Sequence, residues 1–190
     1  MHVAVIYGSV RTNRQGIKLA RFVAAELQRR GCTSRLIDPI EHRLPLLEMQ
    51  YSDYAKGTAP AELEQLAQLF RSVDGFAIVS GEYNHSVPPA LSNLLDYFLE
   101  EYFWRPAGIV TYSGGRFGGV RAAMSLRMML AEMGMPTIPT TLAVPNVGAS
   151  FDDAGVPVDP QFAGRTKQFF DEFYWYMQAL KAQRESGVPY

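Results

Sequence analysis

The chain has 190 residues and a formal net charge of −1, which gives it no bulk attraction for nucleic acid or an anionic membrane. Hydrophobic residues make up 47% and charged residues 19%, so we predict one globular domain spanning residues 1–190. The chain holds one cysteine, Cys32, and three histidines without paired spacing, and we predict neither a disulfide nor a metal site.

The apolar runs are all shorter than the roughly 20 residues needed to cross a bilayer. The first residues also lack the basic start and long apolar core of a signal peptide. We therefore expect a cytoplasmic protein without membrane insertion.

The first third of the chain reads as strand, loop, helix and strand. Residues 3–7 form a short apolar run, as in a strand buried on both faces. Apolar residues at helical spacing predict a helix from about Gly16, with a stop at Gly31. Residues 33–37 read as a second strand. Residues 38–59 show weak periodicity and are predicted to be mostly loop.

The same alternation continues to the end of the chain. The predicted elements are a helix around 63–70, a strand at 75–80, a helix around 91–98, a strand at 107–113, a helix around 123–133, a strand at 140–144, a turn-rich connection at 145–158 and a last helix from Asp159 to about Gln183. Five alternations of strand and helix predict an α/β fold with a parallel sheet and helices on both faces. The length favours a flavodoxin-like three-layer sandwich with a five-stranded sheet in the order 2-1-3-4-5.

In such a sheet, ligands bind beyond the carboxyl ends of the strands, so the loops after Tyr7, Ser80 and Tyr112 are candidates. The first loop, residues 8–16, leads into a helix N-terminus. Its backbone N–H groups, the Ser9 hydroxyl and the Arg11 guanidinium are suited to one phosphate. The spacing fits neither a P-loop nor a G-x-G-x-x-G motif. The alternative is a polar connector with two solvated arginines.

The second loop, residues 81–89, offers the aromatic face of Tyr83 and the amide of Asn84 to a planar heterocycle. The alternative is an Asx-type turn that leads into the next helix, with Ser86 near its cap. No spacing supplies His85 with a carboxylate partner for acid–base chemistry.

The third loop, residues 113–121, is rich in glycine, which lets a backbone approach a ligand closely. Arg116 stands where a dinucleotide fingerprint would need its middle glycine. The alternative is a flexible surface turn.

Two apolar clusters suggest packing or assembly. Methionines gather between residues 124 and 135, where a core or an interface is the expected role. The last helix is apolar nearly all round, from Phe169 to Met177, and this breadth suggests a homodimer contact.

Taken together, the three loops resemble the NADPH-dependent FMN reductase family of flavodoxin-like proteins. The resemblance rests on G-S-V-R-x-x-R-x-G at 8–16, E-Y-N-x-S-x-P-x-x-L-x-N-x-x-D at 82–96 and S-x-G-x-x-G-G-x-R-A at 113–122. It implies an FMN-dependent oxidoreductase that works by a ping-pong cycle. NADPH or NADH gives hydride to the flavin, and a quinone, free flavin, azo dye or metal oxyanion then takes it. It also implies a homodimer or homotetramer.

The resemblance also assigns site residues. The FMN phosphate falls to Ser9, Arg11, Gln15 and Gly16, the border of the isoalloxazine to Glu82, Tyr83 and Asn84, and its pyrimidine edge to Ser113, Gly114 and Gly115. Backbone N–H groups of the third loop would stabilise charge on the reduced ring, so no catalytic side chain is assigned.

The chain departs from the family's frequent residues at four positions. Arg14 and Gly16 stand where many members have Ser and Asn, Gly81 replaces a proline, and Ser92 replaces a frequent lysine.

Two other functions remain open at this point. A flavodoxin-type electron carrier would bind FMN yet react poorly with NAD(P)H, but such carriers are strongly acidic and this chain is not. A non-enzymatic flavin-binding regulatory or interaction protein could keep the same fold.

Overall fold

The computed structural model describes residues 1–190, and its helices and strands alternate as the sequence predicts. The strands are β1 (His2–Tyr7), β2 (Thr33–Ile37), β3 (Gly75–Gly81), β4 (Ala107–Tyr112) and β5 (Thr137–Val144). The helices are α1 (Gly16–Arg29), α2 (Ala61–Ser72), α3 (Pro89–Asp96), α4 (Val120–Glu132), α5 (Val147–Ser150), α6 (Phe162–Arg165) and α7 (Lys167–Ser186), with single 3₁₀ turns at Tyr51–Asp53 and Glu100–Tyr102.

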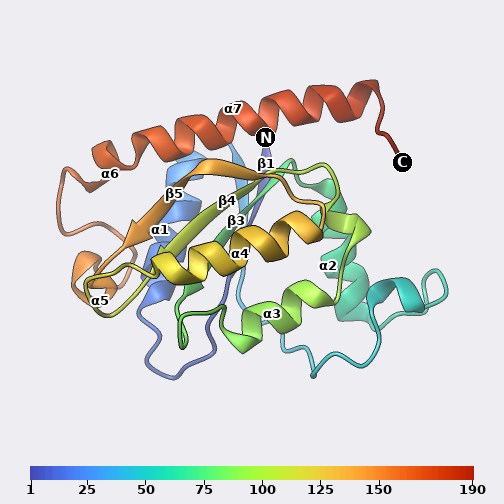
Figure 1. Cartoon of the computed structure of the whole chain (residues 1–190), viewed down its shortest axis with the longest axis horizontal. Coiled ribbons are helices and arrows are strands. Elements are labelled where there is room, and N and C mark those ends of the chain that lie inside the picture. The colour runs from blue at the N-terminus through green and yellow to red at the C-terminus, as the bar shows by residue number, and fades with distance from the viewer.

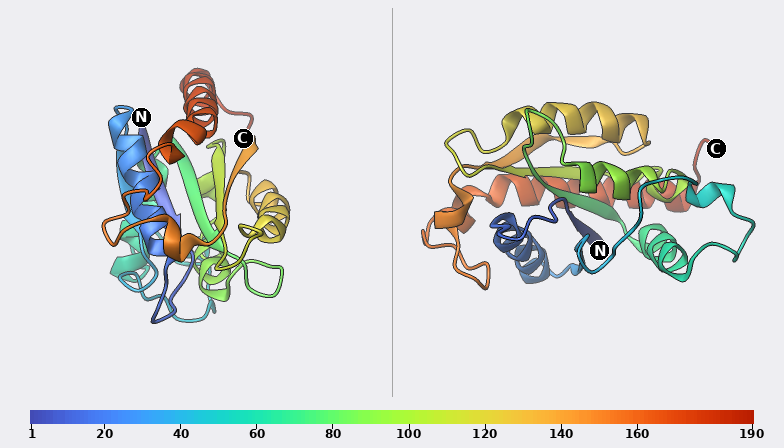
Figure 2. Two further views of the ribbon diagram at one scale, coloured as in Figure 1. Left: turned by 90° about the vertical axis from the view of Figure 1, so that its left-hand side faces the viewer. Right: turned by 90° about the horizontal axis from the view of Figure 1, so that it is seen from below.

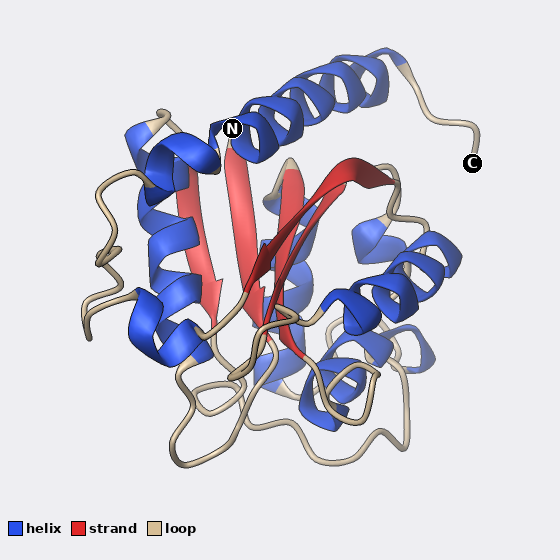
Figure 3. Ribbon diagram, turned by 60° about the vertical axis from the view of Figure 1, so that its left-hand side comes forward, coloured by secondary structure: helices blue, strands red, loops and turns tan.

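All strand pairs are parallel, and the sheet has the order β2-β1-β3-β4-β5, which confirms the predicted flavodoxin-like topology. In Figure 3 the arrowheads of the strands point toward one edge, where long loops gather. The three central strands β1, β3 and β4 are buried along almost their whole length, which is why their sequences are apolar without alternation.

The sheet separates two hydrophobic cores, so the fold has three layers (Figures 1 and 2). Helices α2, α3 and α4 supply one core, with Phe70 and Leu95 fully buried. Helices α1 and α7 supply the other, with Leu19 and Phe173 fully buried. No helix is long and apolar enough to cross a membrane.

The last strand and the last helix differ from their predicted bounds. Strand β5 starts at Thr137, before the predicted residue 140, and includes Pro139, which an edge strand tolerates because one side of it needs no partner. The predicted last helix is interrupted at Thr166, whose buried hydroxyl donates to the carbonyl of Ala163 at 3.0 Å. Helix α7 then runs on to Ser186.

The aromatic residues of α7 are mostly used within the chain. Phe169, Phe170, Phe173 and Met177 are buried against the sheet, and only Trp175 is strongly exposed, at 63%. The breadth of apolar sequence on this helix therefore reflects its packing over the sheet and gives no support to a homodimer contact there.

At the amino ends of the strands, away from the long loops, a buried carboxylate connects the sheet to α7. Asp74 precedes β3, is 5% exposed, and accepts the backbone N–H of His2 at 2.9 Å. Lys181 and Arg184 of α7 approach it at 3.2 and 3.3 Å. Burial acts to raise the pKa of Asp74, but the His2 amide and the two cations outweigh it, so its pKa is lowered.

We predict that Asp74→Asn lowers the free energy of unfolding at pH 7 by about 1–2 kcal/mol, in the lower range for charged hydrogen bonds because Lys181 is 37% exposed. A lowered pKa stabilises the fold above the unfolded value of about 3.9 and stops doing so as the pH falls through the folded value. The difference between the two proteins should therefore shrink below about pH 4 in urea unfolding. Glu132→Gln is the control, because Glu132 is exposed and its carboxyl makes no hydrogen bond. An equal loss at pH 3 and pH 7 would contradict the assignment.

Candidate functional site

The carboxyl ends of the strands surround a polar pocket of about 460 Å³ between the loops that follow β1, β3, β4 and β5. Of the predicted site residues, the structure brings five to its wall: Ser9, Arg11, Gln15, Tyr83 and Gly114. Gly16, Glu82, Asn84, Ser113 and Gly115 lie next to these in the chain but do not line it.

The first loop is built from backbone donors that have no partner. Between Ser9 and Ile17, only the amide of Arg11 donates a hydrogen bond, to Ser9 Oγ at 3.4 Å. Helix α1 starts at Gly16, and its N-cap residue Gln15 makes no side-chain cap. The positive end of the helix dipole and its first N–H groups are thus free for an anion.

The two arginines of this loop have different surroundings. Arg11 is exposed, lines the pocket and makes no side-chain hydrogen bond. Arg14 is bound on both guanidinium nitrogens by Asp38, with Nη2 2.6 Å from Oδ2, and its Nη1 also donates to the Ser9 carbonyl at 3.3 Å. The hydrogen bond to Asp38 raises the pKa of Arg14. A connector with two solvated arginines is therefore wrong for Arg14, which lines the pocket but is paired with Asp38, whereas Arg11 is free to bind a ligand.

Four hydroxyl groups, in two hydrogen-bonded pairs, lie next to this loop. Ser9 Oγ lies 3.0 Å from the hydroxyl of Tyr83, and the Tyr112 hydroxyl donates to that of Tyr7 at 3.1 Å. The rings of Tyr7 and Tyr112 are stacked, with centroids 6.3 Å apart. Burial raises the pKa of both Tyr7 and Tyr112, so both hydroxyls stay protonated at neutral pH.

The second loop is a tight backbone turn. The amides of Tyr83 and Ser86 donate to each other's carbonyls at 3.0 Å, and Asn84 and His85 between them both have positive φ, as in a type I′ turn. The Asn84 side chain makes no hydrogen bond and is exposed. Helix α3 starts at Pro89 without a side-chain cap, so the Asx-type alternative is wrong.

Glu82 links the second loop to the third. Its Oε2 accepts the backbone N–H groups of Arg121 and Ala122 at 3.0 and 3.3 Å, in the first turn of α4. The side chain is therefore engaged in capping that helix and points away from the pocket wall. Its role is to hold the glycine-rich loop in place.

The third loop is closed by its own first residue. Ser113 Oγ accepts the amide of Gly118 at 2.9 Å and donates to the carbonyl of Gly115 at 2.8 Å. A Cβ added to Gly114 or Gly115 would meet nothing within 4 Å, so this backbone faces open space that a ligand can fill. The amides of Gly114 and Gly115 donate no hydrogen bond within the protein.

The structure adds residues that sequence reasoning missed. Tyr112, the last residue of β4, lines the pocket, and so does the segment Asn146–Ala149 after β5. This segment is tied to the third loop, because the amides of Asn146 and Val147 donate to the carbonyls of Gly115 and Ser113 at 3.0 and 3.1 Å. Tyr112 could have been found as the last residue before a candidate loop. Nothing in the spacing of the turn-rich segment pointed to the pocket.

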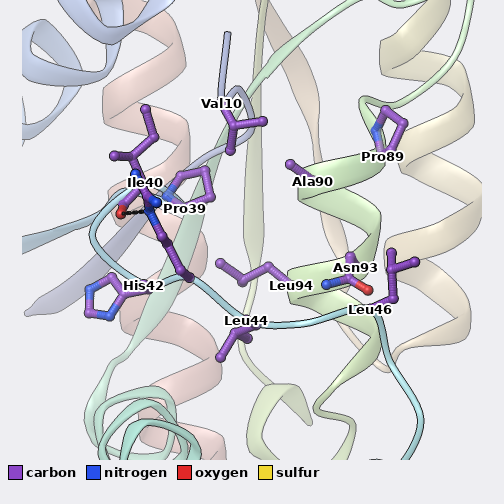
Figure 4. A pocket seen from close by; sticks show the side chains of 11 residues that line it. Val10, Pro39, Ile40, His42, Leu44, Leu46, Pro89, Ala90, Asn93 and Leu94 are labelled. Atoms are coloured by element: carbon purple, nitrogen blue, oxygen red, sulfur yellow. Dashed lines mark hydrogen bonds between the residues drawn. The ribbon is translucent and has the colours of Figure 1, made fainter. Parts of the chain in front are cut away.

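A second hollow of about 500 Å³ lies on the other side of the first loop (Figure 4). Val10, Ile40 and Leu44 face it, together with Ala90 and Leu94 of α3. Its lining is mostly apolar, its His42 is paired with Glu62, and it does not include the N-terminus of α1, so it offers a phosphate fewer donors than the polar pocket. The polar pocket is the candidate cofactor site.

The polar pocket fits a phosphorylated flavin by the chemistry of its donors. The phosphate would find free backbone N–H groups, a helix N-terminus and one unpaired arginine, Arg11. A planar ring would find the half-buried Tyr83 and the open glycine backbone at Gly114 and Gly115.

Comparison with known proteins agrees with this chemistry. The sequence profile of the NADPH-dependent FMN reductase family matches residues 1–149. A quinone reductase of Pseudomonas putida is 29% identical over 178 residues, which cover 90% of this chain and 89% of that protein. An NADPH azoreductase of a Bacillus species is 24% identical over 190 residues, 99% of both chains.

Among solved structures, FerB, a flavoenzyme NAD(P)H:(acceptor) oxidoreductase from Paracoccus denitrificans, has the same fold. It superposes with a TM-score of 0.75 at 21% identity, over 94% of this chain and 97% of FerB. The three loop motifs, the fold and the family match agree, and the chain belongs to the NADPH-dependent FMN reductase family of flavin-dependent NAD(P)H oxidoreductases.

Proposed function

We propose that the protein binds FMN in the polar pocket and uses it to reduce quinones or azo compounds with NADPH or NADH. The observation that carries this proposal is the run of unpartnered amides from Thr12 to Ile17 next to the free guanidinium of Arg11. Bound FMN supplies the redox centre that takes hydride from the nicotinamide and passes it to the acceptor.

The phosphate is assigned to the first loop. The Ser9 hydroxyl and the Arg11 guanidinium bind its oxygens, with Gln15 and the amide of Gly16 at the helix N-terminus. Because Asp38 neutralises Arg14, Arg11 is the arginine of this loop that supplies charge to the phosphate.

The ring is assigned to the second and third loops. Tyr83 and Asn84 border one side, and the backbone of Ser113, Gly114 and Gly115 borders the pyrimidine edge. The free amides of Gly114 and Gly115 stabilise negative charge there without a catalytic side chain. Glu82 acts as a positioning residue, because it holds the start of α4 and hence the third loop.

Quinone and azo acceptors are chosen because two relatives are named quinone reductase and NADPH azoreductase. Free flavin and a metal oxyanion are further candidate acceptors. We also propose that residues 1–190 act as one domain, in the cytoplasm, where NAD(P)H is supplied.

We further propose a homodimer that uses α4 in place of the last helix. Phe117, Val120, Met124 and Met128 lie on one side of α4 and its preceding loop, and they are 44–72% exposed. This stripe is continuous with the third loop, so a second copy seated on it would lie next to the flavin site.

The function is tested by loading the purified protein with FMN, desalting it, and adding NADPH and then a quinone without oxygen. We expect flavin absorption that is retained, bleaches with NADPH and returns with the quinone. Steady-state rates should give parallel double-reciprocal lines. Retained flavin that NADPH and NADH leave oxidised would favour an electron carrier or a flavin-binding regulator.

Arg11→Ala should weaken FMN binding by about 1.5–3 kcal/mol, roughly 10- to 150-fold, because a charged hydrogen bond to the phosphate is lost. Binding to the apo-protein is followed by quenching of flavin fluorescence. Riboflavin, which lacks the phosphate, should bind the variant and the unaltered protein equally. Arg116→Ala is the matched control, since Arg116 does not line the pocket. An equal loss for riboflavin would remove the phosphate role.

Met124→Glu with Met128→Glu should convert the dimer to a monomer, because two charges would be buried at the interface. Light scattering at equal concentration gives the mass. Trp175→Glu on α7 is the control and should leave the dimer intact. A monomer for the unaltered protein, or a dimer lost only in the Trp175 variant, would exclude the α4 interface.

A further inference from the structure

Gly16 is glycine because of a residue far away in the sequence. Its φ lies outside the left-handed region, so the backbone alone admits any side chain. A Cβ at this position, however, would lie 2.0 Å from Cζ of Tyr112 and 2.4 Å from Cε1. The tip of the Tyr112 ring therefore occupies the space of a side chain at the first position of α1.

The same ring limits a second glycine. A Cβ added to Gly81 would lie 3.2 Å from both Cζ and the hydroxyl oxygen of Tyr112. Tyr112 is itself fixed, because it is 8% exposed, stacks on Tyr7 and donates its hydroxyl proton to that of Tyr7. An added Cβ would therefore overlap the ring at Gly16 and make a tight contact with it at Gly81.

Arg14 completes this cluster from the other side. Its guanidinium carbon lies 5.4 Å from the centroid of the Tyr7 ring while Asp38 holds its nitrogens. Arg14, Gly16 and Gly81 thus meet at the Tyr7–Tyr112 stack.

We propose that Tyr112 is a cofactor-binding residue of this chain. Its ring occupies the space that Gly16 and Gly81 leave, and the ring and hydroxyl form the surface of the pocket against which the hydroxylated, phosphorylated tail of the flavin lies. The inference rests on the proposed FMN function and deepens it. Tyr112 lines the polar pocket together with Ser9 and Tyr83. The Tyr83 hydroxyl can donate or accept, and the Tyr112 oxygen, whose proton is donated to Tyr7, can accept from a sugar-like hydroxyl group. The Tyr112 ring supplies an apolar surface for the carbon chain.

The contact between Gly16 and the Tyr112 ring can be tested through both the Tm and the FMN Kd. Gly16→Ala should displace the Tyr112 ring, lower the Tm of the apo-protein by roughly 5 °C and weaken FMN binding at least about tenfold. In a Tyr112→Ala background the ring is gone, so the added Gly16→Ala should change the FMN Kd by less than about twofold and the Tm by less than about 1–2 °C. Gly164→Ala is the control, because a Cβ there meets nothing within 4 Å.

The hydroxyl is tested separately with Tyr112→Phe, which keeps the ring. FMN binding should weaken about 2- to 10-fold, as expected for one neutral hydrogen bond. Lumiflavin, which has the flavin ring without the tail, should bind both proteins equally. A merely structural role for Tyr112 would weaken FMN and lumiflavin by the same factor.

The possible outcomes are distinct. The role of Tyr112 would be overturned, while FMN binding stands, if Gly16→Ala lowered the Tm and the FMN affinity equally with and without the Tyr112 ring. It would also be overturned if Tyr112→Phe weakened FMN and lumiflavin binding by the same factor. Failure of the unaltered protein to bind FMN would overturn the proposed function and this role with it. Two results together support the proposal: Gly16→Ala lowers the Tm and the FMN affinity only when Tyr112 is present, and Tyr112→Phe weakens the binding of FMN but not of lumiflavin.

Discussion

Everything at the functional edge depends on the parallel alignment of the strands. In a parallel sheet each strand ends at the same edge, and each connection must return over a face of the sheet. The loops after β1, β3, β4 and β5 are therefore brought together although they are up to about 140 residues apart in the chain. The apolar helices cover the faces, and the polar groups are left to the carboxyl ends of the strands, where the polar pocket lies.

Neighbouring loops at this edge are held to each other by a continuous set of contacts. Asp38 binds Arg14, Arg14 binds the Ser9 carbonyl, and Ser9 Oγ meets the Tyr83 hydroxyl. Glu82 then binds the start of α4, and the third loop is bonded to Asn146. These contacts hold the loops in place through bonds within the protein, which lowers the conformational entropy that ligand binding must overcome.

This arrangement divides the polar groups of the edge into two kinds. Arg14, Glu82 and Ser113 use their side chains within the protein, and so they set the positions of the loops. Arg11 and the free amides of the first and third loops have no partner inside the chain, and so they are left for the cofactor. Two arginines three residues apart take opposite roles because only Arg14 lies next to a buried carboxylate, Asp38.

The sequence by itself determined the order of strands and helices, the parallel sheet and the three loops, because apolar periodicity and glycine or proline breaks are local properties of the chain. It also placed Ser9, Arg11 and Tyr83 in the pocket. Only the tertiary structure decided that Arg14 and Glu82 are bonded within the protein, that Asn146–Ala149 lines the pocket, and that Tyr112 fills the space beside Gly16. These are contacts between residues far apart in the chain, and no local pattern encodes which side chain lies across from which backbone.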